Sequence, residues 1–208
     1  SDWQPHLERA ASMGFDWVFV NPIQQPGRSG SLYSIADYFQ INKDLLKPGS
    51  RKSPETQVKD MVKQAERLGM RMMIDLVINH CAVDSPLVKE QPEWFRREGG
   101  RVCSPFCVEE DGSRTVWHDL AQLDHQSSSD GSGLLDFCTE VVEFLVGLGF
   151  TGFRCDAAYQ IPRDFWHRLI ERTRRKHPQV VFTAETLGCS PQETRDTASA
   201  GFDYVFNS

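Results

Sequence analysis

The sequence predicts an α/β fold that is built on a parallel β-sheet. Short apolar segments rich in β-branched and aromatic residues alternate along the chain with longer segments of helical periodicity. Strands that read as nearly continuous apolar runs are typical of parallel sheets covered by helices. Two architectures fit this alternation, an open doubly wound sheet and a (β/α)8 barrel. Five strands are predicted, which is too few to close the barrel, so the chain would form part of one.

The first part of the chain, residues 1–79, has the pattern of two helix–strand units. A hydroxyl at Ser53 and a proline at Pro54 are typical of a helix start, because the hydroxyl can cap the helix and proline suits its first position. We expect, in order, a helix over 2–13, a strand over 15–21, a helix over 53–69 and a strand over 71–79.

Residues 80–132 interrupt the alternation. This stretch is rich in Pro, Gly, Ser and charged residues and has no sustained period. So long an irregular segment inside a compact domain is uncommon unless it serves a function. Periodicity returns over 133–208, where we expect a helix over 134–148, a strand over 150–156, a helix from Pro162 to about His177, a strand over 180–185, a short helix over 191–200 and a strand over 202–206.

Composition narrows the partners, metal sites and cellular location that we expect. The net charge is −6 and no basic stripe stands out, so we expect no nucleic-acid partner. No run of apolar residues is long enough to predict a membrane span. The six cysteines are scattered without zinc spacing, which favours a reducing compartment, and hence the cytoplasm, and no metal site. The sequence leaves the oligomeric state open.

Polar side chains recur at the carboxyl ends of the predicted strands. They are Asn21, Asp75, Asn79, His80, Arg154, Asp156 and Glu185. Ligands of parallel α/β sheets bind beyond this edge. Because side chains alternate along a strand, Arg154 and Asp156 share one face. A structural ion pair would explain these two residues taken alone, whereas the whole set predicts a binding or catalytic site.

Two of these carboxylates suit the chemistry of retaining glycoside cleavage. Asp156 and Glu185 lie on consecutive strands and can approach one substrate from both sides. We expect Arg154 to keep Asp156 ionised, as a nucleophile requires. Glu185 follows the apolar run "VVFTA", and desolvation there would raise its pKa, as a general acid requires.

Six motifs, in order, resemble the α-amylase superfamily, glycoside hydrolase family 13. They are "FDWVFVNPI" at 15–23, "YSIADY" at 33–38, "DLVINH" at 75–80, "WHDLAQLD" at 117–124, "GFRCDAA" at 152–158 and "FTAE" at 182–185. The resemblance implies that the chain covers about the second to sixth strands of a (β/α)8 barrel. It also implies that residues 80–132 are a short form of the family's inserted domain B, and that the chain is a fragment of a longer enzyme.

The resemblance implies roles for individual residues. Asp156 would be the nucleophile, Glu185 the acid/base and Arg154 the residue that positions Asp156. The implied substrate-binding set comprises Tyr33, Asp75, Asn79, His80 and Tyr159. The family's third carboxylate, in an His-Asp pair on the seventh strand, would lie beyond Ser208. His118 and Asp119 form such a pair but lie in the excursion, so we do not assign them this role.

The implied activity is hydrolysis or transglycosylation of α-glucosidic bonds in α-glucans or maltooligosaccharides. The segment 81–95 is similar to the branch of the family that transfers maltosyl groups from maltose 1-phosphate. Tyr159 and Gln160 replace the Lys-His pair of many amylases, so calcium is possible but unsupported, and no cofactor is expected. Two alternatives remain: a non-catalytic carbohydrate-binding fragment, and a doubly wound phosphate- or nucleotide-binding domain, which would lack its usual glycine-rich loop.

Overall fold

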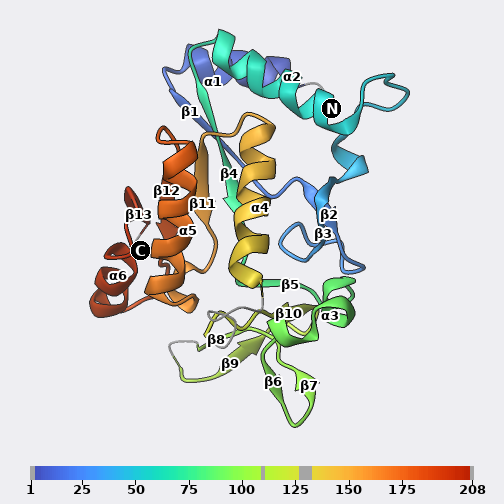
Figure 1. Ribbon diagram of the computed structural model, residues 1–208. Coiled ribbons are helices and arrows are strands. Elements are labelled where there is room, and N and C mark those ends of the chain that lie inside the picture. The colour runs from blue at the N-terminus through green and yellow to red at the C-terminus, as the bar shows by residue number, and fades with distance from the viewer. Residues whose placement is uncertain (1–2, 109–110, 127–132, 207–208) are drawn as a thin grey trace.

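The computed structural model describes residues 3–108, 111–126 and 133–206, and its centre is a five-stranded parallel sheet (Figure 1). Every neighbouring pair in the sheet is parallel, as predicted. The strand order in space is the order along the chain. The strands are β1 (Trp17–Val20), β4 (Arg71–Leu76), β11 (Gly152–Cys155), β12 (Val181–Glu185) and β13 (Tyr204–Phe206).

Helices connect the strands where the sequence predicts them. The helices are α1 (Gln4–Ser12), α2 (Pro54–Arg67), α4 (Leu134–Gly147), α5 (Arg163–Lys176) and α6 (Pro191–Ala198). The Ser53 hydroxyl accepts a hydrogen bond from the Thr56 N–H and caps α2, as expected. Helices α4 and α5 run side by side over one face of the sheet (Figure 1).

The core lies between this face and the helices. Helix α4 is buried along one side, and Phe153 of β11 stacks on Phe182 of β12 with ring centroids 5.4 Å apart. Each such ring contributes about 1.5–3 kcal/mol by leaving water. Trp166 of α5 is fully buried, and its indole N–H donates to the carbonyl of Ala158 at 3.0 Å. The core therefore holds the turn that follows β11.

Two glycines that follow helices differ in how tightly they are packed, and one of them, Gly149 after α4, lies against α2. Gly149 has φ +107°, and a Cβ there would lie 2.8 Å from Cγ1 of Val62. Gly14 also has positive φ, but a Cβ there would meet nothing within 4 Å. We expect Gly149→Ala to lower the free energy of unfolding by about 2–4 kcal/mol, through strain plus overpacking. Gly14→Ala should cost only about 1 kcal/mol. Equal losses in thermal melts of the two variants would contradict this packing.

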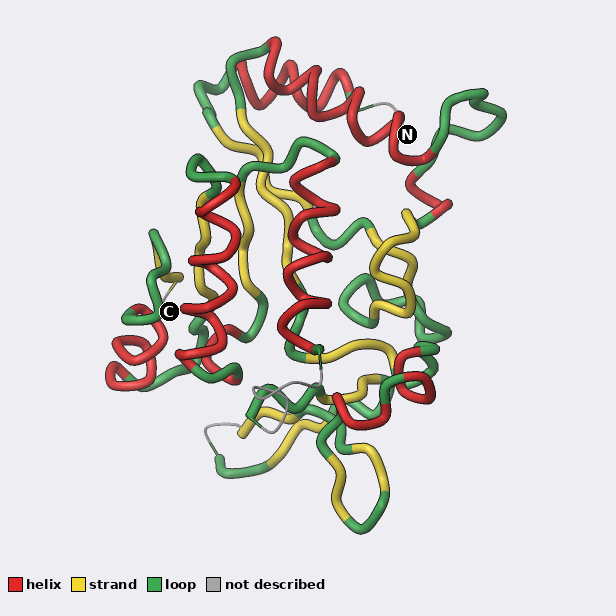
Figure 2. Tube along the Cα trace, in the orientation of Figure 1, coloured by secondary structure: helices red, strands yellow, loops and turns green. Residues whose placement is uncertain are grey.

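The segment between β4 and α4 extends from the carboxyl-end edge of the sheet as a group of short antiparallel pairs (Figure 2). Its elements are β5 (His80–Ala82), α3 (Leu87–Glu90), β6 (Arg97–Glu98), β7 (Arg101–Val102), β8 (Phe106–Val108), β9 (Arg114–Val116) and β10 (Leu120–Gln122). Each strand has two or three residues, which is too short to produce a visible period in the sequence. Residues 127–132 of the predicted excursion lie outside the described residues.

Strand boundaries differ from the prediction at one important place. The predicted strand at 71–79 ends at Leu76, because His80 begins β5, which pairs with β10 instead of continuing the sheet. An antiparallel pair, β2 (Gln24–Pro26) with β3 (Ile35–Ile41), lies between the predicted strand at 15–21 and the predicted helix at 53–69, where we expected no strand. The described residues contain no helix with the length and apolar character of a membrane span.

Candidate active site

The candidate site lies at the carboxyl ends of β4, β11 and β12. Arg154 of β11 is paired in register with Asp75 of β4 on one side and with Thr183 of β12 on the other. Asp156 follows β11 directly, and Glu185 is the last residue of β12. The parallel register therefore brings the three carboxylates to one edge, around one arginine.

Arg154 contacts all three carboxylates. Its Nη1 lies 2.8 Å from Oδ1 of Asp75 and 2.8 Å from Oδ1 of Asp156. Its Nη2 lies 3.6 Å from Oε2 of Glu185. All four side chains are buried or nearly so, with at most 16% of any one exposed. The single guanidinium of Arg154 therefore interacts with three carboxylates in a site that is largely shielded from water.

The prediction that Arg154 keeps Asp156 ionised is wrong in its net effect. Burial and the neighbouring Asp75 raise the pKa of Asp156 to about 7, although Arg154 lowers it. The physical reason is that the guanidinium is shared. Its attraction is divided among three carboxylates, and desolvation penalises the charged forms of Asp75 and Asp156.

Asp75 is the most deeply buried member of this cluster. Burial raises its pKa, while hydrogen bonds from Arg154 and Tyr33 oppose the change. The Tyr33 hydroxyl donates to Oδ2 of Asp75 at 2.8 Å. Burial and this contact raise the pKa of the Tyr33 hydroxyl, so it remains a donor. The contact fixes the ring of Tyr33 beside the carboxylates.

His80 faces the same cluster as a neutral ring. Its Nε2 lies 4.0 Å from Oδ2 of Asp156 and, although buried, has no hydrogen-bond partner among the described residues. Burial lowers the pKa of His80 to about 4, against a weaker opposing hydrogen bond with the backbone of Tyr33. A neutral imidazole at this distance forms no ion pair. Its free nitrogen is available to a ligand hydroxyl.

Backbone N–H groups hold both oxygens of Glu185. Oε2 accepts from the N–H of Ala157 at 2.7 Å, and Oε1 accepts from the N–H of Leu187 at 3.2 Å. Sequence reasoning missed Ala157, because its role depends on a backbone conformation that alanine rarely adopts. The site therefore offers two adjacent carboxylates, one beside a free imidazole and one fixed by the main chain.

Comparison with known proteins shows which enzymes this chain is similar to. A family model described as the glucanotransferase domain of glycogen debranching enzyme matches residues 1–95. The α-1,4-glucan:maltose-1-phosphate maltosyltransferase of Arcanobacterium haemolyticum is 30% identical over 94% of this chain and 29% of its own length.

Solved structures of α-amylases also match nearly the whole of this chain. An α-amylase from Lactobacillus plantarum superposes with a TM-score of 0.77 at 26% identity, over 97% of this chain and 47% of that one. A maltogenic α-amylase from Thermotoga neapolitana gives 0.75 at 29% identity, over 98% and 44%. The chain belongs to the α-amylase family. It spans about 30% of the length of the curated relatives that match it along nearly all its residues.

This α-amylase-family chain is similar to the maltosyltransferases well beyond the segment 81–95. Several proteins of that name match more than nine-tenths of the chain, including one from Myxococcus xanthus at 28% identity. The predicted recognition of the family is therefore confirmed.

Asn79 and Tyr159, the remaining predicted site residues, are joined by a residue that we did not predict. Nδ2 of Asn79 donates to Oε1 of Gln160 at 2.8 Å, and Nε2 of Gln160 donates to the Tyr159 hydroxyl at 3.3 Å. Oδ1 of Asn79 is buried without a partner among the described residues. One free oxygen does not fit calcium, which needs six to eight. We therefore assign no metal to this part of the α-amylase-family site.

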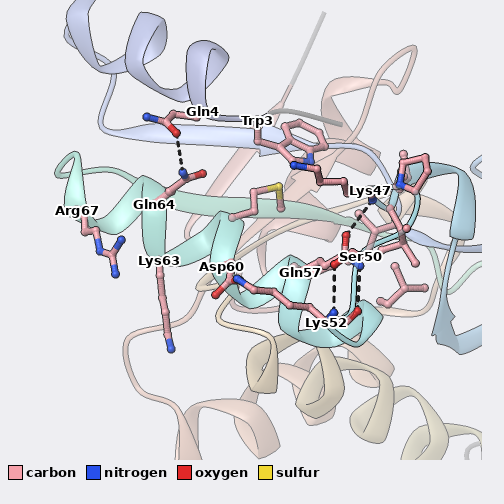
Figure 3. Close-up of a pocket in the computed structure, with 18 residues that line it drawn as sticks. Trp3, Gln4, Lys47, Ser50, Lys52, Gln57, Asp60, Lys63, Gln64 and Arg67 are labelled. Atoms are coloured by element: carbon pink, nitrogen blue, oxygen red, sulfur yellow. Dashed lines mark hydrogen bonds and ion pairs between the residues drawn. The ribbon is translucent and has the colours of Figure 1, made fainter.

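A cavity of the described chain lies elsewhere, between α1, α2 and the loop that follows β3 (Figure 3). Its volume is about 980 Å³, and its lining includes Trp3, Met61, Lys63 and Arg67. None of the predicted site residues lines it. The candidate site is thus defined by the strand ends and their charges, and not by this cavity.

Proposed function

We propose that this site carries out retaining cleavage of α-glucosidic bonds, by hydrolysis or transglycosylation, in an enzyme acting on α-glucans or maltooligosaccharides. Asp156 is the nucleophile and Glu185 the general acid/base. The observation that supports this most is the contact of Arg154 with both carboxylates, which keeps them on one edge of the sheet within reach of one sugar.

The reaction has two steps. Glu185 gives a proton to the glycosidic oxygen while a carboxylate oxygen of Asp156 attacks the anomeric carbon, so the leaving sugar departs and a glycosyl–aspartate ester forms. Glu185 then takes a proton from water or from a sugar hydroxyl, which attacks the same carbon and releases Asp156. Since the pKa of Asp156 is about 7, the first step requires a pH near or above that value.

The other predicted residues orient the sugar. The free Nε2 of His80 can form a hydrogen bond with a hydroxyl of the bound ring. Tyr33 is held by Asp75 and presents its ring to the apolar C–H face of the sugar. The five strands would be the second to sixth strands of a (β/α)8 barrel, and residues 80–132 its inserted domain. This placement is supported by the similarity to the α-amylase structures.

A trapping experiment tests the nucleophile directly. The full-length protein that contains this chain is treated with a 5-fluoro-α-glucosyl fluoride, which forms the glycosyl ester and then reacts slowly. Mass spectrometry of a digest is expected to show one added fluoroglycosyl group on the peptide that contains Asp156. The Asp156→Asn variant, treated identically, should carry no label. A label on another carboxylate, or none in an active protein, would refute the assignment.

A second candidate is maltosyl transfer to or from phosphate. It is favoured because several of the relatives that match nearly the whole chain are named for maltose 1-phosphate. The two activities differ in what attacks or leaves the sugar on Asp156. Product analysis from a maltooligosaccharide, with and without inorganic phosphate, separates them: only the transferase forms a sugar phosphate.

A further inference from the structure

Ala157, directly after the proposed nucleophile, has an unusual backbone. Its φ and ψ are 45° and 42°, and it is the one non-glycine residue with positive φ in the described part of the chain. This left-handed conformation is unfavourable for alanine, because Cβ crowds the following carbonyl. Such residues persist where surrounding contacts impose them, often at functional sites.

Contacts on both sides of Ala157 impose the turn. The N–H of Asp156 donates to the carbonyl of Leu76 at 3.1 Å and continues the sheet ladder. The Ala157 carbonyl then accepts from the N–H of Gln160 at 2.9 Å, and the Ala158 carbonyl accepts from the buried indole of Trp166. The chain therefore leaves β11 and reverses within one residue.

This turn has one consequence inside the site. It points the N–H of Ala157 at Glu185, where the hydrogen bond to Oε2 is 2.7 Å long. The second N–H, from Leu187, belongs to the same loop as Glu185 itself. Within the described part of the chain, the Glu185 carboxylate is linked to the segment that carries the nucleophile by the Ala157 hydrogen bond and by the longer contact with Arg154.

We propose that Ala157 is a positioning residue: its left-handed backbone holds the Glu185 carboxylate in a fixed place relative to Asp156. The inference rests on the proposed function. A main-chain donor cannot swing away as a side chain can, so it fixes the acid/base without adding a charge to the cluster.

The test compares substitutions of similar size that differ in their tolerance of this backbone. Asparagine adopts the left-handed region readily, whereas valine resists it strongly. In the full-length enzyme, we expect Ala157→Val to lower kcat by about tenfold or more through misplacement of the acid. KM should change by less than about threefold, because the residues that contact the sugar are not altered. Ala157→Asn and Ala157→Gly should lose much less of kcat than Ala157→Val, because both residues adopt this backbone readily.

The results of this test distinguish a failure of the positioning role of Ala157 from a failure of the proposed function. Equal behaviour of the Val and Asn variants would overturn the inference, because volume and not backbone conformation would then matter. Should the Val variant fail to fold, a loss of kcat of about tenfold in the Asn or Gly variant overturns it equally. Glu185→Gln tests the proposed function on its own: full activity in this variant would remove the acid/base role. Loss of activity in Glu185→Gln together with an unchanged kcat in Ala157→Val would reject only the positioning role.

Discussion

Asp156→Asn is expected to abolish turnover and to make the folded protein more stable. The amide cannot form the glycosyl ester, so kcat should fall by at least about a thousandfold on a maltooligosaccharide substrate. The asparagine has nearly the same shape as the aspartate, and circular dichroism should show an unchanged fold. A variant with full activity would exclude Asp156 as the nucleophile.

The gain in stability follows from the raised pKa of Asp156. In the folded protein this pKa is about 7, against an ordinary value of 3.8. The folded state therefore binds the proton more tightly than the unfolded state, and the charge on Asp156 destabilises the fold above pH 7. This cost disappears as the pH falls through 7 toward 4. We expect the Asn variant to be more stable by about 2–4 kcal/mol at pH 8, with most of the difference lost at pH 5.

Thermal melts of variant and parent at both pH values measure this difference. The buried His80 is largely neutral at both pH values, because its pKa is about 4, so its titration contributes little to the difference. Asp164→Asn is a matched control, because Asp164 is largely exposed in the first turn of α5. It should change neither turnover nor stability appreciably. A destabilised Asp156→Asn variant at pH 8 would contradict the electrostatic account of the site.

Arg154→Met is expected to have the opposite effect on stability. It leaves Asp75, Asp156 and Glu185 close together without a cation, which is costly for buried carboxylates. The free energy of unfolding should fall by about 3–5 kcal/mol at pH 8, or by about 10 °C in Tm. The loss should be smaller at pH 5, because protonation of the carboxylates relieves their repulsion.

Two further variants sharpen the Arg154 prediction. Arg154→Lys keeps the charge but not the planar fork that reaches several carboxylates together, so it should restore only part of the stability. Arg163→Met removes an exposed arginine of α5 and should change the free energy of unfolding by less than about 1 kcal/mol. An Arg154→Met loss that is the same at pH 5 and pH 8 would show that packing, and not charge, explains the effect.

Much of this arrangement could be predicted from the sequence. Periodicity located all five strands of the sheet, and the alternation of side chains placed Arg154 and Asp156 on one face. Because parallel strands end at a common edge, the polar residues at those ends had to be neighbours. These predictions depend only on local pattern and on the rules of strand pairing.

Other features could not be predicted because they depend on distances between atoms in the folded chain. The pKa of Asp156 results from a balance among burial, Asp75 and a shared guanidinium, and the sign of that balance changes with small differences in distance. The contact between Asn79 and Gln160 joins residues far apart in the sequence. The left-handed backbone of Ala157 has no signal in the sequence, since alanine is a common residue in regular structure.

The order of the strands has a consequence for how the chain is made. In the sheet, β1, β4, β11, β12 and β13 lie in the sequence in which a ribosome produces them. Each newly synthesised strand finds the edge of its predecessor already available, and none has to be inserted between two earlier ones. Assembly during translation, from the amino end onward, therefore needs no rearrangement of strands that have already paired.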